Sequence, residues 1–250
     1  MLKGKTAFIT GTNRGLGRAF VEEFARNGAD VVAHARKETP EFLSFCADAA
    51  SRHGVSVRPV FFDMTDTAKM KETVRNLVSA KVPVHILVNN AGVAHSGLFQ
   101  MTQIEKIKEV FEVNLFSNMA LTQQLLRYIV KCGGGSIVNV ASVSGIDILV
   151  GNCAYGVSKA ALIAFTKTLA AECGINGVRV NAIAPGAADT DMANQMDEKV
   201  KSGKAQRCAM KRRALPIEVA KTAVFLSSDN ASFVNGSVLR VDGGGVTYGI

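Results

Sequence analysis

Paired metal-binding or disulfide-forming residues are missing from this sequence of 250 residues. Its five cysteines are scattered, odd in number and without a CxxC pair, which is typical of free thiols in a reducing compartment. The four histidines form no close pair that could share a metal ion. We therefore expect neither a disulfide-stabilised secreted domain nor a metal site.

Long apolar runs are also missing. No run approaches the roughly 18 residues that a membrane-spanning helix needs. The first five residues lead directly into an apolar segment and lack the long apolar core and cleavage site of a signal peptide. No linker-like or low-complexity stretch divides the chain. We therefore expect a cytoplasmic protein with one domain over residues 1–250 and no contact with a membrane.

Acidic residues are fewer than basic ones, 21 against 29, so the net charge is +8. A basic surface can favour nucleic acid, phosphorylated cofactors or acidic carrier proteins. The densest basic group, residues 199–213, contains no aromatic residue and is typical of a solvated helical face. Since no helix-turn-helix, zinc or RNA-binding signature accompanies it, we expect no nucleic-acid partner.

Short apolar segments alternate with longer segments of helical periodicity along the chain. The strand candidates are residues 5–10, 29–34, 56–62, 84–90, 135–141, 178–184 and 237–241. Strands rich in valine and isoleucine that alternate with helices favour a parallel sheet covered on both faces. Right-handed crossovers then predict an α/β fold: a doubly wound Rossmann fold with a mostly parallel seven-stranded sheet.

A glycine-rich turn follows the first strand candidate. Gly11, Gly15 and Gly17 lie between a strand and a helix, together with Asn13, Arg14 and Leu16. In such a turn the glycines allow a tight bend, close approach of a pyrophosphate and close packing of the helix, whose free amides face the anion. The pattern predicts a dinucleotide site, although any tight strand-helix connection can use glycines.

The second strand candidate lacks the acidic residue that binds the ribose 2′-hydroxyl in an NAD site. Ala35 stands where the acid is expected, and Arg36 and Lys37 follow it. Arg36, with Arg14 from the turn, could hold a 2′-phosphate in bidentate fashion. This pattern favours NADP(H) as the cofactor over NAD, and the alternative is that both arginines are ordinary surface residues.

Tyr155 and Lys159 stand four residues apart in a helical segment, so they share one face of the helix. A nearby ammonium lowers the pKa of a tyrosine, which is about 10 when unperturbed, and lets it exchange protons nearer neutral pH. Ser142 ends the fifth strand candidate, at the sheet edge where doubly wound folds bind ligands. In isolation a Tyr/Lys pair is more often a solvated helix face.

Together these residues resemble the short-chain dehydrogenase/reductase family over essentially the full chain. The matching motifs, in order, are the turn from Thr10 to Gly17, Asp63, Asn89-Asn90-Ala91-Gly92, Asn114, Ser142, Tyr155-xxx-Lys159 and Pro185-Gly186. The resemblance implies that Tyr155 exchanges the proton of the carbonyl or alcohol oxygen and that Ser142 orients this oxygen. It implies that Lys159 binds the nicotinamide ribose and tunes Tyr155, and that Asn114 holds a water of the proton relay.

The resemblance also implies a set of cofactor-binding residues. Asp63 and Met64 would meet the adenine, Asn90 the adjoining ribose region, and the segment after the sixth strand the nicotinamide and diphosphate. The full set is Gly11, Asn13, Arg14, Gly15, Leu16, Gly17, Arg36, Asp63, Met64, Asn90, Ala91, Gly92, Tyr155, Lys159, Pro185, Gly186, Ala188 and Thr190. The hydride chemistry would belong to the cofactor, which the protein orients.

The C-terminal third is most similar to 3-oxoacyl-[acyl-carrier-protein] reductases, in the segments Pro185–Met192, Pro216–Ala220 and Ser227–Gly236. This similarity implies reduction of a 3-oxoacyl thioester carried by an acyl carrier protein or coenzyme A. The chain departs from those reductases at two places where they often carry basic residues: it has Cys132-Gly133 and Asn176-Gly177. Sugars, small alcohols, quinones and steroid-like carbonyls therefore remain alternatives.

Two further expectations follow from the resemblance. Residues 186–213 should form a lid over the substrate. The long helices near 102–131 and 152–174, with the last helix and the apolar ending Val246–Ile250, should form the interfaces of a homotetramer. Two readings outside catalysis are a non-catalytic NADP-binding sensor and a nucleic-acid binder. The complete set of proton-transfer residues argues against the sensor, which needs no proton donor.

Overall fold

The structure, a computed structural model, describes residues 1–147, 149–189 and 208–245. Its centre is one sheet of seven strands in the order β3-β2-β1-β4-β5-β6-β7, and all six neighbouring pairs are parallel. The strands are β1 (Thr6–Ile9), β2 (Asp30–Ala35), β3 (Val57–Phe61), β4 (Ile86–Asn89), β5 (Gly135–Val140), β6 (Val178–Pro185) and β7 (Val238–Val241). All seven strand predictions are confirmed.

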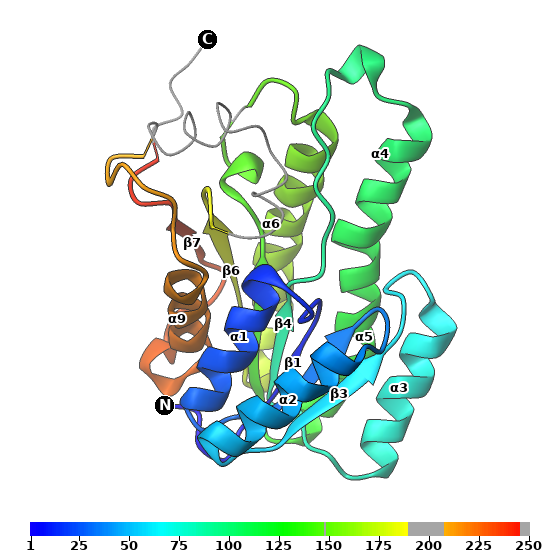
Figure 1. The fold of residues 1–250 in the computed structure, drawn as a ribbon, viewed down its shortest axis with the longest axis vertical. Helices are drawn as coiled ribbons and strands as arrows, with labels where there is room; N and C mark the ends of the chain where they lie inside the picture. Colours follow the sequence, from blue (N-terminus) through cyan, green and yellow to red (C-terminus); the bar gives the residue numbers. More distant parts are fainter. Residues whose placement is uncertain (148, 190–207, 246–250) are drawn as a thin grey trace.

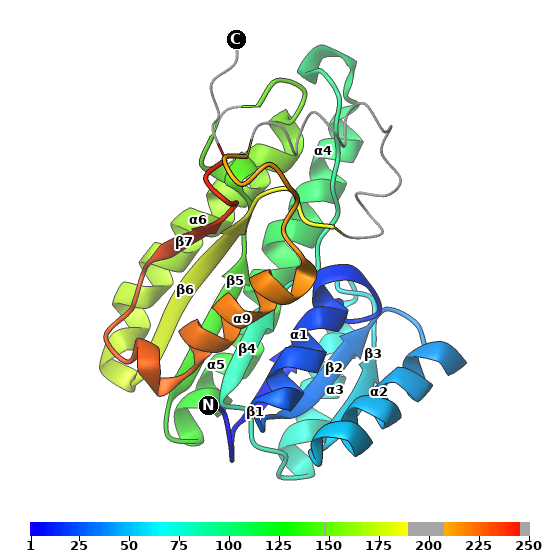
Figure 2. The same ribbon diagram turned by 60° about the vertical axis from the view of Figure 1, so that its left-hand side comes forward.

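Helices cover both faces of this sheet (Figures 1 and 2). They are α1 (Gly15–Arg26), α2 (Pro40–His53), α3 (Thr67–Ser79), α4 (Ile104–Phe111), α5 (Ser117–Lys131), α6 (Cys153–Cys173) and α9 (Pro216–Ser227). One buried core joins α1, α2 and α9 to the sheet, with Phe20, Phe24 and Phe42 at its centre. A second core joins α3, α5 and α6 to the opposite face, and includes Leu121 and Leu125. The doubly wound α/β prediction is confirmed.

Local sequence signals explain where several helices begin and end. In α2, the Thr39 hydroxyl accepts a hydrogen bond from the Phe42 amide, Pro40 begins the helix, and Gly54 ends it with φ of 65°. These are the N-cap, first-turn and C-cap preferences of the three residue types. The Asp66 side chain caps α3 in the same way, by accepting from the Lys69 amide.

The first of the two long helices expected near 102–131 differs from a continuous α-helix. The π-helical turn η2 (Glu112–Phe116) separates α4 from α5. A π turn inserts one extra residue and rotates the side chains around it, and such turns are frequent at functional sites. Asn114, one of the predicted site residues, lies in this turn and is completely buried.

The described residues were also compared with the requirements of membrane-spanning helices and metal sites. None of the helices in the described ranges is long and apolar enough to cross a membrane. No group of three or more histidine, cysteine or acidic side chains in those ranges could hold a metal ion. Residues 190–207 lie outside the described residues. They include Thr190, most of the expected lid and most of the basic group.

Candidate active site

The glycine-rich turn joins β1 to α1 at the carboxyl edge of the sheet. Gly11 has φ of 68°, a conformation that favours glycine. A Cβ at Gly17 would overlap the carbonyl oxygen of Gly11, so only glycine lets α1 approach the turn this closely. Arg14 occupies the N-cap position of α1, but its side chain forms no hydrogen bond with the amides of the first turn. The turn therefore presents uncapped helix amides, the arrangement that binds phosphate groups.

The turn is held from both sides by buried polar side chains. The Thr10 hydroxyl accepts hydrogen bonds from the amides of Asn90 and Ala91, at 2.9 and 2.8 Å. The Asn90 side chain donates to the carbonyl oxygens of Thr10 (2.7 Å) and Gly11 (3.1 Å). Asn90 and Ala91 therefore brace the turn from the β4 side, beside Gly92.

His34 holds the turn from the β2 side. Its Nδ1 accepts a hydrogen bond from the Gly11 amide at 3.2 Å, and its Nε2 lies 2.9 Å from the carbonyl oxygen of Phe62. The ring is 2% exposed and packs against the Phe62 ring. Burial lowers the pKa of His34 from 6.5 to about 4, so the ring is neutral and Nε2 carries the proton that Phe62 accepts.

The residues expected to meet the adenosine end surround the end of β2. Ala35, in place of an acid, is buried, whereas Arg36 and Arg14 are exposed. The Asp63 carboxylate accepts hydrogen bonds from the Thr65 amide and hydroxyl, which together with the nearby Arg36 charge lower its pKa. In contrast to its neighbours, Met64 is 6% exposed and packs in the second core.

Ser142, Tyr155 and Lys159 come together above the carboxyl ends of β4 and β5. The Ser142 side chain lies beside the Tyr155 hydroxyl, where it lowers the pKa of the phenol. The Lys159 ammonium donates to the carbonyl oxygen of Val140 at 2.7 Å and lies 5.9 Å from the centre of the Tyr155 ring. Burial lowers the pKa of Lys159 to about 8.

The pKa of Tyr155 is shifted in the opposite direction to the one predicted from the sequence. The spacing to Lys159 predicts a lowered tyrosine pKa, but burial raises it above 10, and the Ser142 side chain offsets this only in part. The physical reason is that removing a phenolate from water costs more than the surrounding polar groups return. A raised pKa keeps the Tyr155 phenol protonated, which suits a proton donor.

Asn114 is placed by the π turn to face the same cluster. Its side-chain amide donates to the carbonyl oxygen of Val93 and to Ser158 Oγ, both at 3.0 Å, and its Oδ1 accepts from the Val93 amide at 2.8 Å. A Cβ built at Gly92 would lie 3.0 Å from Asn114 Oδ1 and 3.5 Å from Lys159 Nζ. These two side chains therefore border the same small space beside the Gly92 backbone.

The segment after β6 continues from Pro185 at the same edge of the sheet. The Gly186 amide donates to the carbonyl oxygen of Val241, and Ala188 pairs with Ala214 in an isolated bridge. Gly186 thus lies beside the end of β7, and Ala188 lies beside the segment that leads into α9. Of the eighteen residues predicted to bind the cofactor, only Thr190 falls outside the described residues.

Three residues beside the site are absent from the set predicted from the sequence: His34, Asp147 and Arg240. His34 supports the glycine turn, and the signal that could have found it is a polar residue at the end of a buried strand. Asp147 and Arg240 form an ion pair between the Ser142 loop and β7. They stand 93 positions apart, so no local pattern could have found this pair.

Comparison with known proteins agrees with this geometry. The sequence profile of the family described as enoyl-(acyl carrier protein) reductase matches residues 11–246. The chain belongs to the short-chain dehydrogenase/reductase family. It is an oxidoreductase of a family that binds a nicotinamide cofactor.

Two relatives carry the same name. The chain is 38% identical to the 3-oxoacyl-[acyl-carrier-protein] reductase FabG of Thermotoga maritima, over 97% of this chain and 98% of that protein. It is 33% identical to the FabG of Escherichia coli, over 97% of each. A solved structure of L-sorbose reductase from Gluconobacter frateurii with NADPH and L-sorbose superposes with a TM-score of 0.91 at 31% identity, covering 99% of this chain and 98% of that one.

Proposed function

We propose that this protein reduces the ketone of a 3-oxoacyl thioester to a secondary alcohol with NADPH. The observation that carries the proposal is the placement of the Ser142 side chain beside the Tyr155 phenol and close to Lys159, at the same edge of the sheet as the glycine turn. A protonated phenol beside a second hydroxyl can donate a proton to a carbonyl oxygen and hold it in place.

In the proposed reaction each side chain has one task. Tyr155 donates its proton to the carbonyl oxygen, while Ser142 Oγ donates a hydrogen bond that orients this oxygen. Lys159 stays mostly protonated at neutral pH because its pKa is about 8, and it holds the ribose next to Tyr155. Asn114 and Lys159 border the space beside Gly92, where a water could return a proton to Tyr155.

The cofactor fits the glycine turn and the residues around it. The helix amides that follow Arg14 would hold the diphosphate, Asn90 the adjoining ribose, and the segment from Pro185 the nicotinamide end. When bound, the nicotinamide would supply the hydride. Arg36 and Arg14 are exposed and could bind a 2′-phosphate, and position 35 holds alanine in place of an acid, which supports NADPH over NADH.

The thioester substrate rests on the FabG relatives and on the similarity of the C-terminal third. The L-sorbose reductase structure supports the second candidate, a small sugar or alcohol. The positions before β5 and β6 do not decide between them. Cys132-Gly133 and Asn176-Gly177 lie side by side, since the Gly135 amide donates to the Gly177 carbonyl, but at the amino edge of the sheet, opposite Ser142.

A substrate panel tests the proposal. Purified protein is assayed with NADPH and, separately, NADH against a 3-oxoacyl carrier protein, a 3-oxoacyl coenzyme A, L-sorbose and simple ketones. We expect the highest kcat/KM with a 3-oxoacyl thioester and NADPH. Higher efficiency with L-sorbose would favour the second candidate, and no oxidation of NADPH with any carbonyl would refute a reductase.

We also propose a homotetramer. Ile104, Phe116 and Met119 expose apolar side chains on α4, η2 and α5, and Phe225 and Leu239 do so on α9 and β7. These are the elements that family members commonly pair across two-fold axes, and closed symmetry is usual for homo-oligomers. Residues 246–250 lie outside the described residues. A monomer by light scattering at micromolar concentration would refute this assembly.

A further inference from the structure

An ion-pair network joins the last strand to the loop that follows Ser142. The Arg240 guanidinium, on β7, donates to both carboxylate oxygens of Asp147, from Nη1 at 3.1 Å and from Nη2 at 2.7 Å. Its Nε donates to Asp242 Oδ2 at 2.9 Å. The hydrogen bonds with Asp147 and Asp242 raise the pKa of Arg240 further above its ordinary value, so the cation persists over the whole working pH range.

One side of this network is the catalytic loop. Asp147 follows the short 3-10 turn that begins directly after Ser142, and its amide donates to the Val143 carbonyl at 2.8 Å. The Ser142 hydroxyl accepts from the Ser144 amide at 3.1 Å. A Cβ at Gly145 would stand 2.7 Å from the Lys159 backbone, so this turn packs directly on α6 beside Lys159. The same turn therefore joins Asp147 to Ser142 and rests on α6.

The other side of the network is the end of β7 and the turn that follows it. This part of the chain contacts residues near the beginning and near the end of the segment 186–213. The Gly186 amide donates to the Val241 carbonyl at 3.0 Å, and the Met210 amide donates to the Gly243 carbonyl at 3.2 Å. The Cys208 thiol also donates to the Gly243 carbonyl, at 3.0 Å. Arg240 thus lies between the Ser142 loop and the two points from which that segment leaves the sheet.

We propose that Arg240 is a positioning residue of the reductase site: through Asp147 it holds the Ser142 loop in register with α6 and with both ends of the segment 186–213. This inference rests on the proposed function. Asp147 is 15% exposed and Arg240 is 35% exposed, so solvent reaches the pair only in part. A shift of about 1 Å in a reacting group can lower a rate by about a hundredfold.

The test compares Asp147→Asn, Arg240→Gln and the double variant with the parent protein. We expect kcat for ketone reduction to fall by at least roughly tenfold in each single variant. The double variant should fall no further, because both changes break the same contact. The dissociation constant of NADPH should stay within twofold and the Tm close to that of the parent. Arg240→Lys should recover part of the rate.

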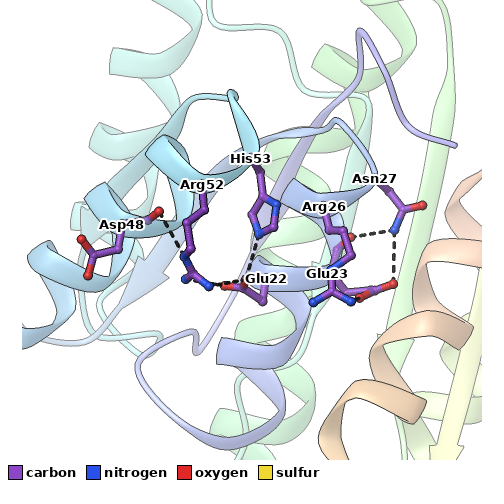
Figure 3. Close-up of polar contacts among 7 residues, drawn as sticks. All are labelled: Glu22, Glu23, Arg26, Asn27, Asp48, Arg52 and His53. Atoms are coloured by element: carbon purple, nitrogen blue, oxygen red, sulfur yellow. Dashed lines mark hydrogen bonds and ion pairs between the residues drawn. The ribbon is translucent and has the colours of Figure 1, made fainter.

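A matched control is available at the opposite end of the molecule. Arg52 on α2 forms a bidentate pair with Glu22 on α1, at 2.9 and 3.0 Å, and Glu22 also contacts His53 (Figure 3). Arg52→Gln removes the same charge and the same kind of contact far from Ser142. We expect kcat in this variant to stay within twofold of the parent.

Amide hydrogen exchange of a peptide covering residues 142–152 gives a readout that needs no activity. Exchange there should be faster in Asp147→Asn and Arg240→Gln and unchanged in Arg52→Gln. Unchanged exchange in the first two variants, or an unchanged kcat in Asp147→Asn, would overturn the positioning role. If the parent protein reduces no ketone, the proposed function fails, and the exchange result still decides whether Arg240 holds the loop.

Discussion

The two sides of the candidate site are held together by different forces. On the cofactor side, buried neutral groups fix the glycine turn: the Gly11 amide donates to His34 Nδ1, and the Thr10 hydroxyl accepts from Asn90 and Ala91. On the substrate side, the Ser142 loop is tied to β7 by the Arg240–Asp147 ion pair, which solvent partly reaches.

The two kinds of contact differ in strength and in their response to salt. A buried hydrogen bond between neutral groups is insensitive to salt, and leaving one partner unsatisfied costs about 1–3 kcal/mol. A partly exposed ion pair is weaker and is screened by salt. We therefore expect the proposed cofactor side to be the more rigid of the two, and the proposed substrate side to respond more strongly to salt.

The largest expected effect comes from the residue that serves both sides. Lys159→Ala removes the ammonium next to Tyr155 and leaves the buried Val140 carbonyl oxygen without its donor. Turnover should fall by roughly two to three orders of magnitude, the usual scale for a disturbed proton transfer. NADPH affinity should also fall. The measurement is kcat with a parallel binding titration; a normal dissociation constant for NADPH would show that Lys159 serves the chemistry alone.

His34→Leu should damage only the cofactor side, because it removes the acceptor of the Gly11 amide. We expect the NADPH dissociation constant to rise by roughly tenfold, which is about 1.4 kcal/mol, while kcat at saturating NADPH stays within twofold. His34→Asn is the matched control, since its amide oxygen can accept the same hydrogen bond. Equal affinities in the parent and the leucine variant would contradict a supporting role for His34.

His34 also predicts an acid limit for stability. Its pKa is about 4 in the folded chain against an ordinary value of 6.5, so between these pH values the unfolded chain binds a proton that the folded chain does not. The stabilising contribution is therefore full above pH 6.5 and is lost as the pH falls towards 4, by about 3 kcal/mol in total. Urea unfolding at pH 7 and pH 4.5 measures this loss, which His34→Asn should reduce.

The sheet and the glycine-rich turn between β1 and α1 could be predicted from the sequence because both depend on local patterns. The five inner strands are short runs of mostly buried residues, and the glycines mark a turn whose geometry favours glycine. The π turn at Asn114 escaped prediction because adjacent helical residues show no break in periodicity. The raised pKa of Tyr155 escaped it because burial depends on the packed structure, and the Arg240–Asp147 pair because it spans 93 positions.

Cofactor preference gives a moderate effect on the cofactor side. The parent protein should bind NADPH at least about tenfold more tightly than NADH, equivalent to about 1.4 kcal/mol. Arg36→Asp replaces a cation with an acid that repels a 2′-phosphate and accepts from a ribose 2′-hydroxyl, so it should shift the preference towards NADH. Fluorescence titration with NADPH and with NADH measures the two dissociation constants. Equal values in the parent protein would refute the proposed preference for NADPH.

The smallest expected effect is the dependence of kcat on salt concentration, which should arise on the substrate side alone. At saturating NADPH, raising NaCl from about 0.05 to 0.5 M should lower kcat by about twofold, because salt screens the partly exposed Arg240–Asp147 pair. In Arg240→Gln the same salt series should leave kcat unchanged. A salt dependence that persists in this variant would show that the substrate side is not held by this charge.

Turnover of Tyr155→Phe tests whether Tyr155 is the proton donor. The substitution keeps the ring and removes only the hydroxyl that lies beside Ser142. We expect kcat for ketone reduction to fall by roughly two orders of magnitude or more, the usual scale for general acid catalysis, while NADPH affinity hardly changes. Activity within twofold of the parent would contradict the assignment of Tyr155 as the proton donor.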